Sequence, residues 1–258
     1  MLKTEVVGFT SYRSIGEKLP SYLGEPARTY GKDAVSVGLL AEPSLEKIAA
    51  LEPDLILSAK VRHEALYDEL TDIAPTVFSE TTGAAWKENL QLTAVVLGKE
   101  SAARHALRSY EGRVKDIGRA VKAKLGGTLP TVSVVRFLDE PTVRLYQPES
   151  YSGVVLSDLG FRRPADQPKA PDDGIAADVS EENILQVDAD LIFLCTWDDD
   201  KGLSEKTRER FTGNPPWRKL KGQQVEVSDT TWMTAVGLIG AHAILDDVAG
   251  QFDVDAAR

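Results

Sequence analysis

Apolar residues in the middle of the chain recur at the spacing of one helix face. Within residues 101–127, SAARHALRSYEGRVKDIGRAVKAKLGG, they stand three or four positions apart, which predicts one long amphipathic helix. Gly126-Gly127 supplies a stop signal, and Gly118 marks a point where the helix could break. At about 1.5 Å per residue the helix would span about 37 Å, a length that suits a strut between two lobes. The predicted stripe comprises Leu107, Tyr110, Val114, Ile117, Val121 and Leu125.

Two segments on either side of this helix share the same pattern. Residues 44–57 read SLEKIAALEPDLIL, and residues 180–193 read SEENILQVDADLIF. In each, a serine with a glutamate close behind it predicts a helix N-terminus. The apolar run after the aspartate predicts a strand covered on both faces, as in a parallel sheet. One copy alone is an ordinary helix–turn–strand unit, but two copies predict two α/β lobes of related design.

Apolar runs and turn residues predict the remaining elements. Asp139-Glu140-Pro141 forms a hairpin turn in this interpretation, and residues 162–174, rich in Pro and Asp, form an irregular surface loop. Strands are expected at residues 6–10, 55–58, 76–79, 132–137, 142–146 and 224–229, and further helices at 152–160 and 234–252. The chain then divides into an N-terminal lobe (1–100), an interlobe helix (101–126) and a C-terminal lobe (127–258).

Composition excludes several classes of function and of structural feature. The 258 residues carry a formal net charge of -10, and no basic cluster offers the positive face that nucleic acid requires. Cys195 is the only cysteine, which excludes an intrachain disulfide and a thiolate metal cage; within LIFLC it is expected to be a small buried residue. No apolar run reaches the length of about 20 residues that a membrane helix needs. The first residues lack the layout of a secretory signal, so either the protein is cytoplasmic or a targeting segment lies outside this chain.

Several of these segments resemble a known family. EPSLEKIAALEPDLIL, KVRHEALYDELTDIAPTVF and the long helix are similar to the siderophore-binding proteins of ABC importers, in the helical-backbone metal receptor superfamily that also binds vitamin B12 and haem. VVRFLDEPTVRLYQPESYSGVVLSDLGFRRP and DTTWMTAVGLIGAHAILDDV resemble the second lobe of that family. The resemblance implies the class III periplasmic-binding-protein type of α/β fold, in which two Rossmann-like lobes are joined by one long helix and hold the ligand in the cleft between them.

The resemblance also implies a function. KVRHEALYDELTDIAPTVF looks like the branch that binds hydroxamate or mixed citrate-hydroxamate siderophores. Such a protein captures a ferric siderophore and delivers it to an ABC transporter permease. It is extracytoplasmic, as a periplasmic protein or a membrane-anchored lipoprotein, and we expect a monomer. Iron(III) arrives within the siderophore, so no intrinsic cofactor or protein metal ligand is expected. Family members have a first strand and helix ahead of the point that matches Met1, so the N-terminal lobe is expected to lack them.

A ferric hydroxamate needs donors for its oxygens and aromatic faces for its alkyl skeleton. Arg62 follows a predicted strand, and ligands in α/β proteins bind beyond strand C-termini; a solvated arginine is the alternative. Arg136 lies within a strand, where a charge is costly unless it faces a cleft or an ion pair. Trp197 and Trp232 follow two strands of the second lobe, which predicts a stacking wall, with ordinary packing equally compatible.

Four further side chains complete the predicted ligand site. Tyr146, Tyr151 and Ser152 bracket the turn before a short helix and could donate hydrogen bonds, although Ser152 could instead cap that helix. Trp86 is placed in the first lobe by its segment TTGAAWKENL, with helix packing as the alternative. Tyr12-Arg13, after the first strand, is a weaker candidate.

Two glutamates have a separate predicted role. In the resembled family, one exposed glutamate on each lobe pairs with arginines of the permease. The repeat places Glu46 and Glu182 at equivalent positions, so the resemblance assigns this docking role to them. Helix-start electrostatics explain the same residues without a partner.

Other functions fit the sequence less well. A zinc or manganese carrier would need histidines that converge on one ion, whereas His63, His105 and His242 fall in three different helical segments. A haem or corrinoid carrier of the same superfamily stays open. A small-molecule enzyme is disfavoured, because the chain has no glycine-rich phosphate loop, no G-x-S-x-G elbow and no His–acid pairing at catalytic spacing.

Overall fold

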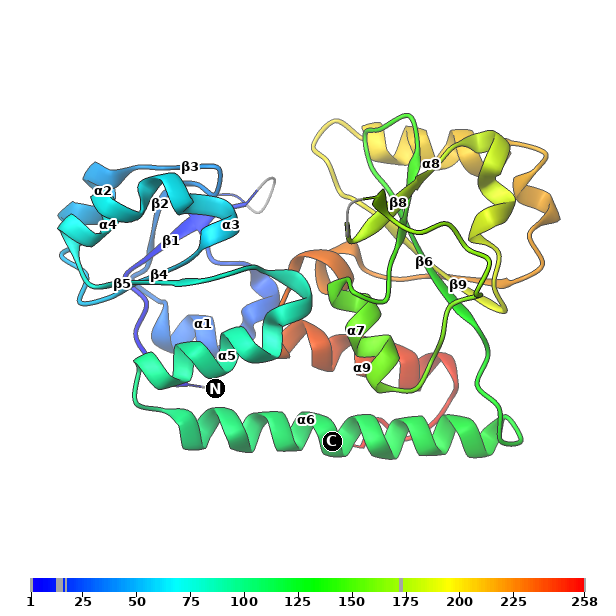
Figure 1. Ribbon diagram of the computed structural model, residues 1–258, viewed down its shortest axis with the longest axis horizontal. Coiled ribbons are helices and arrows are strands. Elements are labelled where there is room, and N and C mark those ends of the chain that lie inside the picture. Colours follow the sequence, from blue (N-terminus) through cyan, green and yellow to red (C-terminus); the bar gives the residue numbers. More distant parts are fainter. Residues whose placement is uncertain (1, 13–15, 17, 172–173, 258) are drawn as a thin grey trace. The chain divides into compact units, whose positions relative to one another are not determined.

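The computed structural model describes residues 2–12, 16, 18–171 and 174–257. The chain forms two compact units, Met1–Arg108 (unit 1) and Ser109–Arg258 (unit 2). Helix α6 (Glu100–Lys124) crosses the boundary between them without a break, as Figure 1 shows. The long helix predicted from the apolar spacing is therefore confirmed. The three-part division at residues 100 and 126 stays a prediction.

The unit 2 part of α6 packs through the predicted stripe. Tyr110, Ile117 and Val121 are fully buried, whereas Leu125, beyond the end of the helix, is exposed. Gly118 does not break the helix. A Cβ atom there would lie 2.8 Å from the carbonyl oxygen of Leu159, so glycine permits a close approach of the α6 backbone to the end of α7 (Tyr151–Asp158).

Unit 1 contains two small sheets. In the first, β1 (Gly8–Ser11) pairs in parallel with β2 (Val35–Leu39), which pairs antiparallel with β3 (Glu42–Pro43). In the second, β4 (Ile56–Ala59) pairs in parallel with β5 (Thr76–Ser79). The helices of the unit, visible in blue to cyan in Figure 1, are α1 (Gly24–Tyr30), α2 (Leu45–Ala50), α3 (Lys60–His63), α4 (Tyr67–Ile73) and α5 (Trp86–Val96), with 3-10 turns at Ser21–Leu23, Glu64–Leu66 and Gly83–Ala85.

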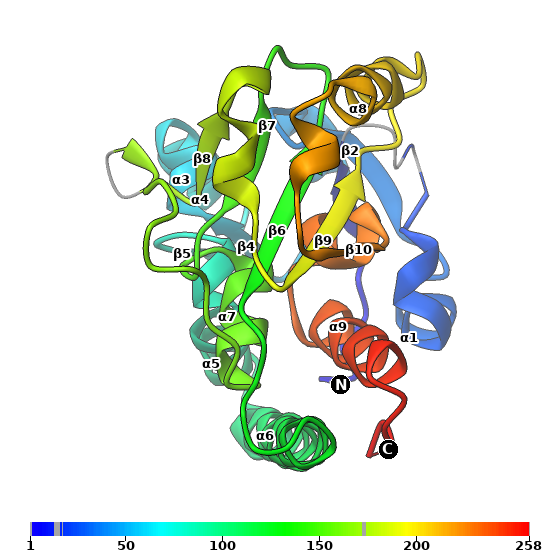
Figure 2. The ribbon, with the colours of Figure 1, turned by 90° about the vertical axis from the view of Figure 1, so that its right-hand side faces the viewer.

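Unit 2 contains one five-stranded sheet of order β10-β9-β6-β7-β8 (Figure 2). Strand β6 is parallel to β9, which is parallel to β10, whereas β7 pairs antiparallel with β6 and β8. The β6–β7 pair confirms the predicted hairpin around Asp139-Glu140-Pro141. The strands are β6 (Val132–Phe137), β7 (Val143–Tyr146), β8 (Ala176–Val179), β9 (Leu191–Thr196) and β10 (Gln223–Glu226).

Both faces of the unit 2 sheet are covered. Alternate residues of β6 point to opposite faces, and Val135 and Phe137 join a buried cluster with Phe211 and Trp217. On the other face, Phe193 packs against the indole of Trp232, in the segment before α9. The first face carries η6 (Glu181–Val187), α8 (Leu203–Gly213) and η7 (Trp217–Lys219), and the second carries α7, η8 (Thr230–Thr234) and α9 (Leu238–Gln251).

The two copies of the sequence repeat fold only partly alike. Ser44 caps α2 by accepting a hydrogen bond from the Lys47 backbone N–H at 3.3 Å. Ser180 precedes a 3-10 helix and makes no such side-chain cap. The strand that follows is buried in unit 2 but only half-buried in unit 1, where Leu57 exposes 45% of its surface. The prediction of a strand covered on both faces is thus confirmed for β9 and wrong for β4.

Within the part of the chain that the structure describes, no helix combines the length and apolarity needed to cross a membrane. Cys195 is a buried residue of β9, and burial raises the pKa of its thiol well above the ordinary value. The prediction of a small buried residue rather than a reactive thiol is confirmed.

Candidate ligand-binding site

Several polar and aromatic side chains of unit 2 come from the ends of its parallel strands. Arg136 is the fifth residue of β6, Trp197 follows β9, and Asp229 follows β10. Because β6, β9 and β10 are parallel, their carboxyl ends lie at one edge of the sheet, where ligands of α/β proteins bind. The backbone N–H of Trp197 donates to the carbonyl of Phe137 at 3.1 Å, which joins the ends of β9 and β6 directly.

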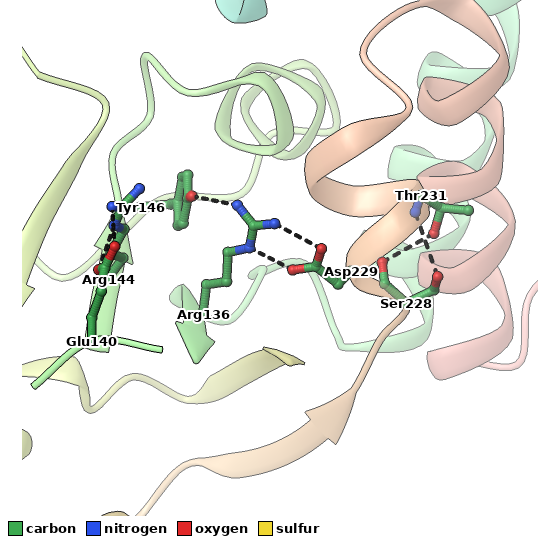
Figure 3. A network of polar contacts seen from close by, with 7 residues as sticks. All are labelled: Arg136, Glu140, Arg144, Tyr146, Ser228, Asp229 and Thr231. Atoms are coloured by element: carbon green, nitrogen blue, oxygen red, sulfur yellow. Dashed lines mark hydrogen bonds and ion pairs between the residues drawn. The ribbon is translucent and has the colours of Figure 1, made fainter. Parts of the chain in front are cut away.

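The centre of this edge is a buried ion pair between Arg136 and Asp229 (Figure 3). Arg136 Nε donates to Asp229 Oδ1 at 2.5 Å and Nη2 donates to Oδ2 at 2.7 Å. The two side chains expose only 6% and 7% of their surfaces. Arg136 Nη1 donates to the hydroxyl of Tyr146 at 3.3 Å. Burial alone would lower the pKa of Arg136, but the hydrogen bonds and charge of Asp229 together with Tyr146 raise it above the ordinary value, so the guanidinium stays charged.

A second arginine lies directly opposite the first. Arg144 of β7 is the register partner of Arg136, and like charges in that position are destabilising. Each arginine has its own carboxylate, because Glu140 accepts two hydrogen bonds from Arg144 (Figure 3). This second pair is about one-third exposed. Of the alternatives for Arg136, an ion pair and a ligand cleft, the structure shows the ion pair.

Trp197 is half-buried at the end of β9. The neighbouring Thr196 has a buried hydroxyl without a hydrogen-bond partner among the described residues. Asp199 accepts hydrogen bonds from the backbone N–H groups of Leu203 and Ser204, and these bonds lower the pKa of its carboxyl. Asp199 therefore satisfies backbone N–H groups at the start of α8 (Leu203–Gly213).

Trp232 does not form a wall with Trp197. Its ring is fully buried, lies 4.6 Å from the ring of Phe193, and donates its indole N–H to Asp247 at 2.7 Å. Burial raises the pKa of Asp247, an effect that the Trp232 hydrogen bond opposes. The packing interpretation of Trp232 is the one that this geometry favours.

Tyr151 and Ser152 open helix α7. The hydroxyl of Tyr151 donates to the carbonyl of Gly237 at 2.7 Å. The helix is capped by Ser150, which accepts from the Gly153 N–H, so the alternative of Ser152 as the cap is wrong. The hydroxyl of Ser152 is buried and has no hydrogen-bond partner in the described part of the chain, which leaves it with unused donor and acceptor capacity.

The unit 1 candidates lie at element starts. Arg62 is exposed in α3. Trp86 is buried at the start of α5, with the ammonium group of Lys87 5.6 Å from its ring centre. Tyr12 is half-buried after β1, and Arg13 lies outside the described residues.

Glu46 and Glu182 are both exposed, near the starts of α2 and η6. Neither forms an ion pair with a described residue within 4.0 Å. By contrast, the adjacent Glu181 accepts hydrogen bonds from Arg210 and Asn214. The two predicted docking residues are therefore available to an external partner.

No group of three or more His, Cys, Asp or Glu side chains in the described residues could hold a metal ion. The buried His63 is satisfied by the Ser58 hydroxyl and the Leu40 carbonyl, each at 2.6 Å. His242 contacts Arg113 at 2.8 Å. These side chains have internal partners.

Sequence reasoning missed Asp229, the residue that fixes Arg136. The available signal was its position at the end of the predicted strand 224–229, because a buried arginine requires a nearby carboxylate. It also missed Glu140, which was interpreted only as part of a turn. Neither carboxylate could be paired with its arginine before the sheet order was known.

The comparisons with known proteins agree with this architecture. The family model for periplasmic binding proteins matches residues 5–223. The chain belongs to the periplasmic binding protein family. It is 39% identical over 246 residues to the probable siderophore-binding lipoprotein YfiY of Bacillus subtilis, covering 90% of this chain and 74% of that protein. It is 30% identical over 234 residues to the Fe(3+) dicitrate-binding periplasmic protein FecB of Escherichia coli, covering 87% and 72%.

Among solved structures, Staphylococcus aureus SirA complexed with staphyloferrin B gives a TM-score of 0.85 at 31% identity, covering 99% of this chain and 88% of that one. The family match confirms the resemblance noted in the sequence and the fold class, with two sheet-containing lobes and the long helix α6. It also confirms that the chain is a substrate-binding transport protein rather than an enzyme.

Proposed function

We propose that this binding protein captures a ferric siderophore outside the cytoplasm, as a periplasmic or membrane-anchored protein, and delivers it to an ABC transporter permease. The observation that carries the proposal is the 39% identity to a siderophore-binding lipoprotein over 90% of the chain. Iron enters as part of the ligand, so the proposal requires no protein metal ligand.

The strand ends of unit 2 suit such a ligand. A guanidinium has five N–H donors, and Arg136 uses three of them on Asp229 and Tyr146. The remaining N–H groups and the Ser152 hydroxyl can serve the anionic oxygens of a ferric complex. Trp197 offers an aromatic face for its skeleton. Arg62, Trp86 and Tyr151 complete the proposed ligand-binding set, and Trp232 would act through packing.

For the ligand class, we propose a mixed citrate-hydroxamate siderophore. The hydroxamate part rests on the segment at residues 60–78. The citrate part is supported by the 30% identity to a protein named for binding Fe(3+) dicitrate. A carboxylate-bearing complex also matches an arginine whose partner in the structure is itself a carboxylate.

Tryptophan fluorescence tests the proposal. Ferric hydroxamates absorb visible light, so binding near an indole should quench the emission. We expect saturable quenching by ferric citrate-hydroxamate complexes and less by iron-free siderophore, haem or cobalamin. Trp197→Phe should remove most of the quenching, whereas Trp217→Phe, at a buried indole bonded to Gln224, should preserve it. Saturable binding of haem or cobalamin alone would favour the alternative carriers, and no response to any ferric siderophore would contradict the proposal.

The role of Arg136 is tested by substitution with a matched control. Arg136→Lys keeps a charge but loses the two-pronged contact with Asp229, and we expect affinity to fall by roughly tenfold or more. Arg144→Lys changes the arginine on the adjacent strand and should leave affinity within about twofold. Circular dichroism checks that both variants are folded. Unchanged affinity in folded Arg136→Lys would remove Arg136 from the site.

Delivery to the permease is tested separately from binding. Glu46→Ala and Glu182→Ala remove exposed carboxylates without an internal partner, so ligand affinity and Tm should be unchanged while iron uptake in cells falls. Glu64→Ala, another exposed carboxylate of unit 1, is the control and should transport normally. Normal uptake by the Glu46→Ala, Glu182→Ala double variant would refute the docking role.

A further inference from the structure

Unit 2 contains a cavity of about 790 Å³ beside the first half of β6. Its walls are Val132 and Val134 of β6, the turn at residues 146–149, one side of α7, and the segment that follows α7. This cavity is on the side of β6 from which Arg136 also projects, and Tyr146 is common to both: its side chain lines the cavity while its hydroxyl contacts Arg136. The other proposed siderophore residues do not line it.

Arg163 is held in this wall by a chain of side-chain hydrogen bonds. Its Nε donates to Gln167 Oε1 at 2.7 Å. The amide nitrogen of Gln167 in turn donates to the Ser133 hydroxyl at 2.6 Å and to the carbonyl of Asp188 at 3.0 Å. Gln167 thus fixes the guanidinium against the sheet. Arg163 Nη2 is buried and has no hydrogen-bond partner among the described residues.

This arginine differs from the comparable arginines of the protein. Five arginines in the described residues are buried or half-buried, and Arg163 is the one whose guanidinium has no carboxylate within 4.0 Å. Even partial burial of a cation is costly without a counter-ion. Burial lowers the pKa of Arg163, and the charge of Glu149 offsets part of this effect. An aspartate or glutamate pairs with each of the other four, Arg113, Arg136, Arg144 and Arg208.

The described part of the cavity wall is positive although the chain as a whole is acidic. Among the described residues it contains Arg162, Arg163 and Lys169 against one carboxylate residue, Glu149. Apolar side chains, among them Leu156, make up much of the rest. One half-buried cation without an ion-pair partner, beside apolar walls, suits a single carboxylate on an apolar skeleton better than a compact dianion such as phosphate.

We propose that this cavity is a second binding site, which takes a small organic acid whose carboxylate accepts a hydrogen bond from the guanidinium of Arg163. Gln167 is the residue that positions Arg163. The charges of Arg162 and Lys169 attract the anion without a direct contact. The site is distinct from the Arg136–Asp229 pair, although Tyr146 lines the cavity and also contacts Arg136.

Ligand-observed NMR on the full chain tests the proposal with benzoate as the probe. Benzamide has the same ring without the charge, and inorganic phosphate has charge without the ring. A hydrogen bond to a charged group contributes roughly ten- to a hundredfold in affinity. We therefore expect benzoate to bind at least about tenfold more tightly than benzamide, with phosphate weaker than benzoate. If the wild-type protein bound benzoate and benzamide with equal affinity, or did not bind benzoate, that result alone would overturn the proposal.

Paired variants locate the site. Arg163→Met keeps an unbranched apolar side chain and removes the guanidinium, so benzoate affinity should drop to that of benzamide. Arg162→Met makes the same substitution at the exposed neighbour and should keep most of the affinity. If Arg163→Met does not fold, Arg163→Lys is the substitute, because it retains a cation there. It should bind benzoate more weakly than wild type does, but still more tightly than it binds benzamide. Wild-type benzoate affinity in folded Arg163→Met would place the anion elsewhere and overturn the assignment.

Discussion

The two units of the chain bury their sheets to very different extents, although both combine parallel strands with helices. In unit 2, β6 is buried along its whole length and β9 over five of its six residues. In unit 1, no residue of β5 is fully buried, and Leu57 of β4 is largely exposed. Sheets of two and three short strands cannot shield both faces, whereas five strands between two helical layers can. Tertiary packing is therefore concentrated in unit 2.

Truncating one phenylalanine in each unit tests this contrast most directly. Phe137 of β6 is fully buried, between rings of Phe211 and Trp217. Phe78 of β5 is half-buried against Tyr67. Phe137→Ala should cost about 3–5 kcal/mol, and Phe78→Ala less than half of that. Because the units need not unfold together, amide hydrogen exchange read by mass spectrometry should report each one. Equal losses of protection in the two units would contradict the contrast.

The ion pairs of the two units provide the next comparison. Asp229→Asn leaves the buried Arg136 charge without its counter-charge and should destabilise unit 2 by about 3 kcal/mol. Glu80→Gln removes a carboxylate 3.5 Å from Lys60 in unit 1, where both side chains are largely solvated, and should cost less than about 1 kcal/mol. Urea unfolding at two salt concentrations measures both effects. A small loss in Asp229→Asn would mean that water enters and compensates the Arg136 charge.

The sequence predicted the fold better where it repeats a pattern over many residues. The apolar stripe over Leu107–Val121 located α6 to within two residues at each end, because a 25-residue helix provides many repeats of one signal. The strands 76–79 and 132–137 were predicted with the observed bounds. The second repeat copy was predicted only as a short helix, and it is a 3-10 helix. Local residue types do not determine which hydrogen-bond pattern so short a turn adopts.

The candidate site was less accessible to sequence reasoning. That Arg136 requires a partner follows from its place within a strand, but its carboxylate lies 93 residues away. Only the sheet order brings it there. The same holds for Trp232, whose indole partner Asp247 comes from the next helix. Position after a strand was a sound signal for proximity to the sheet edge, but it could not distinguish a half-buried residue, Trp197, from a fully buried one, Trp232.

The two repeat copies predict a smaller difference between the units. Ser44 caps α2 in unit 1, whereas the hydroxyl of Ser180 in unit 2 caps no helix and accepts from the Asn183 side chain at 3.3 Å. Ser44→Ala should cost about 1 kcal/mol, and Ser180→Ala only a few tenths. Thermal unfolding of the two variants under identical conditions measures both. A larger loss for Ser180→Ala would show that the exposed Asn183 contact matters more than a helix cap.

The smallest expected effect concerns pH and compares a half-buried histidine of unit 2 with an exposed one of unit 1. Arg113 always donates, so His242 Nδ1 must accept its 2.8 Å hydrogen bond and the ring is neutral. Burial and the charge of Arg113 lower the pKa of His242, and Asp246 opposes them in part. The unfolded chain therefore binds a proton on this histidine at a higher pH than the folded chain, so stability should fall as the pH drops through about 6.5.

The fall in Tm between pH 7.5 and 5.5 should shrink in His242→Gln, which retains a polar group beside Arg113. His105→Gln, on an exposed face of α6, should leave the pH dependence as in wild type. If His105→Gln flattens the profile and His242→Gln does not, the pH dependence originates in unit 1, and the Arg113 contact is not what keeps His242 neutral.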